Sequence, residues 1–281
     1  MRFARAILPS FLIMTPSFAF AQGAAGLMPH RAVYELTLDK ASEQSGIADI
    51  AGRMVYEFNG SHCTGFTTSF RFVTEIDTND ATRITDQQTK TFESADGKRF
   101  DFETKSYVDR ALDRELKGSA SNENAKLDVK LDKPQENDVS LPAAQFPTQH
   151  MLDLLTRAQK GESFYETTLF DGSDEGDKLM STSVVIGKPT KGTSKEAEAP
   201  ALGAVSDQNY WPVEMAYFDL IGDGGEETPD YRTSFKLYAN GLTRDLTMDY
   251  GDFSMRGRLV KLEMLDPQPA SCDEAKPTSK P

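Results

Sequence analysis

The chain has few of the residues on which most catalytic and metal sites depend. Its 281 residues include three histidines, two cysteines and one tryptophan. His30, His62 and His150 form no H-E-x-x-H zinc motif, and neither a G-x-S-x-G turn nor a glycine-rich phosphate loop is present. We therefore expect no enzyme activity, no catalytic residue, no cofactor and no bound metal.

Three weaker candidates for a chemical site remain. Asp171 and Gly176 match a calcium loop, but Thr182 stands where that loop requires a bidentate glutamate, so a solvated turn is the better interpretation. Asp245 and Asp249 lie on one strand face at i and i+4, about 13 Å apart, too far to act as a carboxylate pair. His150, near the start of a predicted helix, is the best single candidate for proton transfer, but packing or capping explains it better.

Long apolar runs are missing after residue 21. Residues 1–21 combine Arg2 and Arg5, an apolar stretch interrupted by Pro9, and an Ala19-Phe20-Ala21 ending, as in a cleaved secretory signal peptide. A membrane span would need about 20 consecutive apolar residues. The sequence predicts a mature protein that begins at Gln22 and is soluble in the periplasm.

Positive charge is in short supply. The chain carries 44 acidic against 31 basic residues, a net charge of −13, and loss of Arg2 and Arg5 with the signal peptide takes it to −15. So acidic a surface repels nucleic acid and anionic lipid head groups. The expected partners are proteins or neutral ligands.

The two cysteines are far apart. Cys63 and Cys272 lie near opposite ends of the mature chain, and export would place them where disulfides form. A redox or metal pair is the alternative, but there is no C-x-x-C spacing and no histidine cluster. A bridge across about 210 residues would favour one closed domain, residues 22–281, and stabilise it by up to ~5 kcal/mol.

Apolar and polar residues alternate along most of the mature chain. Phe66, Phe70, Phe72 and Ile76 share one face of a predicted strand, and Asn-Gly or Asp-Gly pairs separate strands at residues 59–60, 96–97 and 240–241. This pattern predicts a mainly β protein built from an antiparallel sheet with one buried face.

Other segments interrupt that pattern. Residues 117–125 read as a connecting loop, and residues 187–206, poor in apolar side chains, as a long mobile loop. Pro212 favours an edge strand, or a strand that begins after the proline. The tail after residue 266 is expected to be held by Cys272.

Helical periodicity is convincing only within residues 146–166. Met151, Leu155 and Ala158 recur on one face, Thr148 is placed as the N-cap, and Gly161 is placed to end the helix. A helix of about 12–14 residues is marginal alone in water. We expect it to lie against the sheet and to join two runs of antiparallel strands.

A whole-chain resemblance rests on four segments: LPAAQFPTQHMLDLL, FDGSDEGDKLMSTSVVIGKP, NYWPVEMAYFD and PDYRTSFKLYANGLTRDLTMDYGDFSMRGRLVKLE. With the signal peptide and one early and one late cysteine, they resemble the EipB-type cell envelope integrity family of Gram-negative periplasms. The resemblance implies an open, spiral-like antiparallel sheet, similar to a broken barrel, with one short helix among its strands. It also implies a Cys63–Cys272 disulfide.

The functional implication of the resemblance is a non-catalytic periplasmic protein that supports envelope integrity by binding a periplasmic tetratricopeptide-repeat protein. For the contact surface, the acidic loop with Glu226, Glu227 and Asp230 is favoured over exposed strand edges, because edges usually carry protection against pairing. The alternative function is a carrier that holds a lipophilic ligand or a lipoprotein acyl chain in the concave face of the sheet, near Phe66 and Phe72.

Overall fold

The computed structural model describes residues 26–173, 175–220, 228–266 and 272. Within these residues the chain forms one 15-stranded antiparallel sheet, two short α-helices and two single 3₁₀ turns. In chain order the elements are β1 (His30–Ala41), η1 (Glu43–Ser45), β2 (Ile47–Ser61), β3 (Gly65–Thr78), β4 (Thr82–Glu93), β5 (Arg99–Val108), β6 (Ala111–Glu123), β7 (Lys126–Lys133), β8 (Asn137–Pro142), α1 (Pro147–Lys160), β9 (Phe164–Leu169), β10 (Met180–Ile186), β11 (Thr190–Lys191), α2 (Ala199–Leu202), η2 (Gly203–Val205), β12 (Asn209–Asp219), β13 (Tyr231–Tyr238), β14 (Thr243–Asp249) and β15 (Phe253–Met264).

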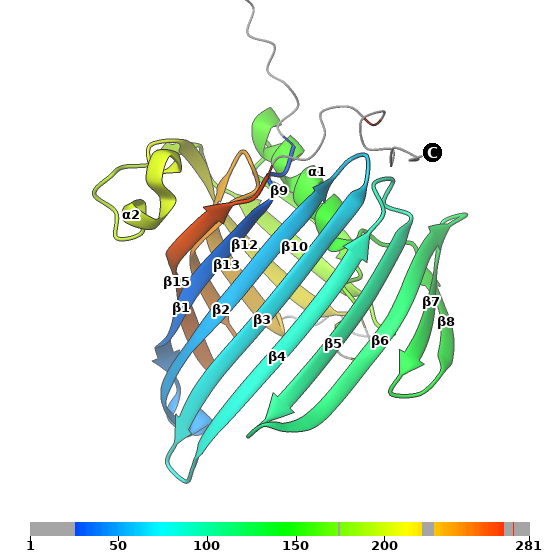
Figure 1. Cartoon of the computed structure of the whole chain (residues 1–281), viewed down its shortest axis with the longest axis horizontal. Helices are drawn as coiled ribbons and strands as arrows, with labels where there is room; N and C mark the ends of the chain where they lie inside the picture. Colours follow the sequence, from blue (N-terminus) through cyan, green and yellow to red (C-terminus); the bar gives the residue numbers. More distant parts are fainter. Residues whose placement is uncertain (1–25, 174, 221–227, 267–271, 273–281) are drawn as a thin grey trace, which may run out of the picture.

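The sheet consists of two runs of strands that meet at the first and last strands. β1 to β8 follow one another on one side, and β1 pairs with β15. The other side continues in the order β15, β14, β13, β12, β10 and β9, and the short β11 pairs only with β12. The sheet curves strongly but stays open, with β8 and β9 as its edges, and α1 connects these two edges on the concave side (Figure 1). This arrangement confirms the prediction of an open antiparallel sheet with a helix among its strands.

The core follows from the two-residue alternation of the strands. Inward side chains such as Tyr34, Leu36 and Met54 are almost fully buried and pack with Leu154 and Leu155 of α1 in a large cluster. A smaller cluster lies under β5 to β7 and contains Phe100, Phe102, Phe146 and Phe170, whose rings stack or meet edge to face. Burial of these apolar faces is the main force that holds the curved sheet around the helix.

The first turn of α1 is held by an acid from a distant strand. Phe146, not Thr148, is the N-cap residue, so the predicted cap is wrong. The Glu93 carboxylate, 2 % exposed at the end of β4, accepts hydrogen bonds from the backbone N–H groups of Thr148 at 2.8 Å and Gln149 at 2.9 Å. Burial raises the pKa of the Glu93 carboxyl, and these donors counteract part of that rise. Gly161 ends the helix in the left-handed conformation as predicted.

A short contact brings the two edges of the sheet together. The backbone N–H of Gln145 donates to the carbonyl of Thr168 at 2.9 Å, and the N–H of Phe170 donates to the carbonyl of Gln145 at 3.0 Å. The Gln145 side-chain oxygen also accepts from the Thr167 hydroxyl at 3.0 Å. Gln145 therefore fixes the path from β8 into α1 against β9.

Two loop predictions are corrected by the structure. Residues 117–125 continue β6 as far as Glu123, and the turn lies at Asn124 and Ala125, which both have positive φ angles. The Gly-rich turn after β9 is not fully solvated either, because Gly172 and Gly176 lie against the Phe102 ring. In both places a glycine allows close packing: Gly118, like Gly172, lies against the Phe102 ring, where a Cβ would not fit.

The segment of residues 187–206, called the α2 segment from here on, is also ordered, contrary to the prediction. It contains β11, α2 and η2, and Ala199 and Leu202 are buried. β12 is an interior strand, paired with β10 and β13, although Pro212 lies within it. The Pro212 carbonyl accepts from the Gly187 N–H at 2.7 Å, so the proline nitrogen faces the same side, away from β13. On that side β10 ends opposite Val213 and β11 begins opposite Tyr210, so neither strand needs the missing N–H.

Candidate functional site

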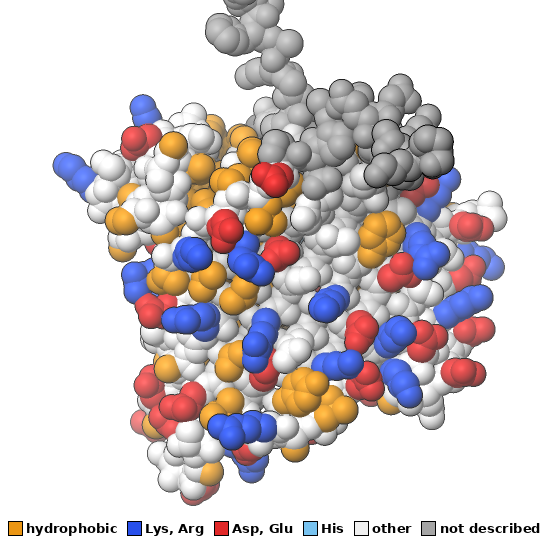
Figure 2. Space-filling view, viewed as in Figure 1, with side chains coloured by type: hydrophobic (Ala, Val, Ile, Leu, Met, Phe, Trp, Pro, Cys, Tyr) orange, Lys and Arg blue, Asp and Glu red, His pale blue; other side chains and the backbone are white. Residues whose placement is uncertain are grey.

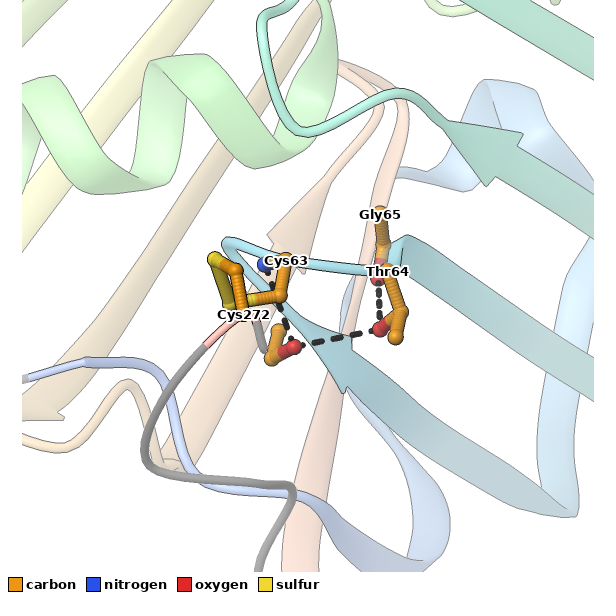
Figure 3. Close-up of a disulfide and its surroundings, with 5 residues drawn as sticks. Cys63, Thr64, Gly65 and Cys272 are labelled. Atoms are coloured by element: carbon orange, nitrogen blue, oxygen red, sulfur yellow. Dashed lines mark hydrogen bonds between the residues drawn. A yellow bond between two sulfur atoms is a disulfide. The ribbon is translucent and has the colours of Figure 1, made fainter. Parts of the chain in front are cut away.

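The disulfide joins the β2–β3 turn to the chain after β15. Cys63 and Cys272 are bonded with a sequence separation of 209, which confirms the predicted bridge. The Cys63 N–H donates to the Ser61 hydroxyl at 3.2 Å, and the Ser61 and Thr64 hydroxyls are 3.1 Å apart (Figure 3). The turn is thus held by its own hydrogen bonds as well as by the disulfide.

The imidazole of His62 lies beside the disulfide. One ring nitrogen of His62 and the sulfurs of Cys63 and Cys272 all lie within 4.8 Å of one another. His62 and Cys272 are exposed and Cys63 is half-buried. Within the described part of the chain this is the single group of three or more potential metal ligands.

The concave face carries a pocket at the end away from the disulfide. Its volume is about 300 Å³, and its apolar lining includes Phe72, Ile76, Tyr250, Phe253 and Met255. The Tyr250 ring lies 4.9 Å from the rings of both Tyr231 and Phe253. A pocket of this size is at the low end of those that bind small ligands. Phe66, by contrast, is buried against Phe58. β3 therefore contributes Phe66 to the core and Phe72 to the wall of the pocket.

His150 lies inside the core rather than at a reactive surface. It is 4 % exposed, and its Nε2 is 3.0 Å from the Tyr165 hydroxyl. Burial lowers the pKa of His150 from 6.5 to about 4, because the charged imidazolium would lose its hydration; the nearby Asp153 carboxylate opposes this effect and Arg157 adds to it. The geometry agrees with a packing role.

This depressed pKa predicts acid sensitivity. The unfolded chain binds a proton at His150 near pH 6.5 and the folded chain only near pH 4, so stability from this residue is present above pH 6.5 and is lost as the pH falls. We expect a loss of about 2 kcal/mol between pH 7.5 and 5 from this residue. Urea unfolding of wild type and His150→Gln at both pH values tests this. An equal loss of unfolding free energy between pH 7.5 and 5 in wild type and in His150→Gln would contradict it.

A cluster of charged side chains fixes the α2 segment on the outer side of β12 to β15. Arg244 and Glu198 are 2 % and 5 % exposed. The Arg244 guanidinium donates to the Tyr238 hydroxyl at 2.8 Å and to Glu198 at 3.3 Å, and it also contacts Glu196. We call these four residues the Arg244 cluster; sequence reasoning missed it.

Glu198 also fills a break between two strands. Its Oε1 accepts from the backbone N–H of Asp245 at 3.1 Å and from that of Leu259 at 2.6 Å. Asp245 has a positive φ of 53°, and the pairing of β14 with β15 stops at Leu246 and Gly257. The carboxylate therefore replaces the strand partner that these two N–H groups lack.

The outer face of the sheet is covered with mixed charges. Arginines and lysines alternate with acids over β1 to β6, and Figure 2 shows both signs interspersed across this face. Ion pairs join Arg31 to Glu57 and Arg71 to Asp86, each at 2.8 Å. An open depression of about 660 Å³ lies among them, over β1 to β4. The acids on this face are therefore interspersed with bases and do not form a single acidic patch.

The residues predicted to bind a partner are only partly described. Glu226 and Glu227 lie outside the described residues. Asp230 is exposed, and one of its carboxylate oxygens accepts from the backbone N–H of Asp219 at 2.8 Å. This hydrogen bond joins the end of β12 to the residue just before β13. Among the acids considered for a carboxylate pair, Asp245 forms an ion pair with Lys236 at 3.0 Å and Asp249 accepts from Gly251 N–H, which fits structural roles for both.

The fold and sites define a class: an open, strongly curved antiparallel sheet wrapped around one helix, with a disulfide between the β2–β3 turn and the chain after β15. The EipB-like family matches residues 21–266, and the chain belongs to that family. It is 51% identical over 269 residues to the cell envelope integrity protein EipB of Brucella abortus, covering 94% of this chain and 95% of that protein. The crystal structure of a β-barrel-like protein of a domain of unknown function from Brucella abortus is 53% identical, with a TM-score of 0.82 over 86% of this chain and all of that chain.

Both helices of the described residues are short, and neither has the length and apolar character needed to cross a bilayer.

Proposed function

We propose that this protein is a non-enzymatic periplasmic factor that maintains cell envelope integrity by binding another periplasmic protein, one with tetratricopeptide repeats. The observation that carries the proposal is the 51% identity, over nearly the full length of both chains, to a protein named for cell envelope integrity. A disulfide and a signal-like N-terminus support an exported location. Because His150 is buried and bonded to Tyr165, the best candidate for proton transfer has no access to a substrate.

Partner recognition is assigned to the acidic loop of residues 223–230. On β1 to β6 the acids are interspersed with bases and form ion pairs such as Arg31–Glu57 and Arg71–Asp86, whereas residues 223–230 contain no lysine or arginine. Four acids fall within eight residues of this loop: Asp223, Glu226, Glu227 and Asp230. Such a concentration of charge attracts a basic groove over a distance of about 8–10 Å at physiological salt.

Deletion of the gene is expected to sensitise the cell to detergents and to antibiotics that act on the cell wall. The Glu226→Gln/Glu227→Gln double variant should restore resistance poorly and should capture less partner from a periplasmic extract, with the largest deficit at low salt. Asp113→Asn/Glu136→Gln removes two exposed acids elsewhere and is the matched control. Asp230→Asn is kept separate because its carboxylate also bonds Asp219 N–H. Equal capture by the two double variants would contradict a role for the loop.

A second function is favoured by one observation, the apolar pocket of about 300 Å³ on the concave face. A carrier of a lipophilic ligand would place an acyl chain there, against Phe72 and Phe253. Protein purified from the periplasm without detergent should then contain lipid in a fixed molar ratio. An unaffected envelope in the deletion strain, together with such bound lipid, would replace the scaffold proposal by the carrier.

A further inference from the structure

The side chains of His62, Cys63 and Cys272 form a set of potential metal ligands whose two thiols are available only when the disulfide is reduced. Two thiols and an imidazole are a set of donors that binds Zn²⁺ well, and in a tetrahedral zinc site the sulfurs lie about 3.8 Å apart with Zn–S near 2.3 Å. In the oxidised protein the two sulfurs and the imidazole nitrogen already lie within 4.8 Å of one another. Small side-chain rotations bring them to ligand distances once the S–S bond is broken.

The surroundings keep these donors together after reduction. His62 and Cys63 lie in a turn that is held by hydrogen bonds through Ser61 and Thr64, none of which involves a sulfur atom. On the other side, the Leu265 N–H donates to the Pro29 carbonyl at 3.0 Å, which fixes the chain beside β1. Cys272 follows Leu265 by only seven positions. So short a tether keeps its thiol at a high effective concentration near Cys63.

We propose that reduction of the Cys63–Cys272 disulfide creates a zinc site in which both thiolates and the His62 imidazole are ligands. A dithiol reductant supplies two electrons and two protons to the S–S bond and is itself oxidised to a disulfide. Zn²⁺ then displaces the two thiol protons and takes the imidazole as a neutral ligand, which leaves one position for water. The metal restores the connection between the β2–β3 turn and the C-terminal chain that reduction removed. This role is independent of partner binding.

The direct test is zinc titration of the purified protein after reduction and removal of the reductant without air. We expect one Zn²⁺ per chain in reduced wild type and none in oxidised wild type. Cobalt in place of zinc should give thiolate-to-metal absorption bands in the near ultraviolet. His62→Ala should bind zinc at least tenfold more weakly, and His62→Cys should recover the affinity because it supplies a third thiolate.

Two results would overturn the proposal. One is reduced wild type that binds zinc no more tightly than Cys63→Ser/Cys272→Ser. The other is His62→Ala with wild-type affinity, which would remove the imidazole from the site. Circular dichroism checks that each variant is folded, and the comparison of oxidised with reduced wild type stays decisive even if the serine variant is unstable.

Discussion

Replacement of Glu198 by alanine is expected to lower the free energy of unfolding by about 3–5 kcal/mol, the range for removal of one partner from a buried ion pair. Glu198 is 5 % exposed and faces Arg244, which is 2 % exposed. Without the carboxylate, the guanidinium keeps its bonds to Tyr238 and Glu196 but loses its buried counter-ion. Urea unfolding at neutral pH measures the loss.

The loss of backbone hydrogen bonds in β14 and β15 adds to the destabilisation expected for Glu198→Ala. The N–H groups of Asp245 and Leu259 would lose their acceptor, and each buried unsatisfied donor costs about 1–3 kcal/mol. Glu196→Ala is the matched control, because its side chain is 25% exposed and it accepts no such backbone bond among those described. We expect it to lower stability by less than half as much.

A double variant separates the two contributions of Glu198. Replacing a buried ion pair on both sides by apolar residues of similar volume is often nearly neutral. Glu198→Leu/Arg244→Met should nevertheless stay destabilised, because leucine cannot accept from the two backbone N–H groups. Wild-type stability in this double variant would show that the ion pair alone accounts for the effect.

The sequence predicted those parts of the fold that depend on neighbours in the chain. Alternation in β3, the Asn240-Gly241 turn and the Gly161 helix end all require only local residue types, and each lies where it was predicted. The open curvature came from the resemblance to a family, and the pairing of β1 with β15 was not predicted, because alternation gives a strand its buried face but not its neighbour.

The parts that could not be predicted depend on single polar contacts between distant segments. Glu93 reaches the N-terminus of α1 across 55 positions, and Glu198 reaches Leu259 across 61. In the sequence, Glu198 is one acid in a segment with few apolar residues, which is typical of a solvated loop. Its burial depends on contacts that the sequence does not show: Arg244, and the break in β14–β15 pairing beside Asp245, which has a positive φ. The zinc ligands were missed for the same reason, since His62 and Cys272 meet only in the folded chain.

Loss of the disulfide is the second large effect that we expect. A cross-link over 209 positions restricts the unfolded chain, and the chain-entropy relation gives up to about 5 kcal/mol for a loop of this length. The folded state loses little, because the hydrogen bonds of the Ser61–Thr64 turn and the pairing of β1 with β15 remain. Cys63→Ser/Cys272→Ser should therefore unfold at lower urea concentration while its circular dichroism spectrum is unchanged.

The reductant provides the internal control for this prediction. Oxidised wild type should fall to the stability of the double serine variant when a thiol reductant is added, and the variant itself should not respond. A chelator is present throughout, so that zinc cannot replace the covalent link in the reduced protein. Because the restriction acts on the unfolded chain, the reduced protein should also expose more surface on unfolding and show a steeper dependence on urea. Equal midpoints for oxidised and reduced wild type would mean that the C-terminal chain contributes nothing to folding through Cys272.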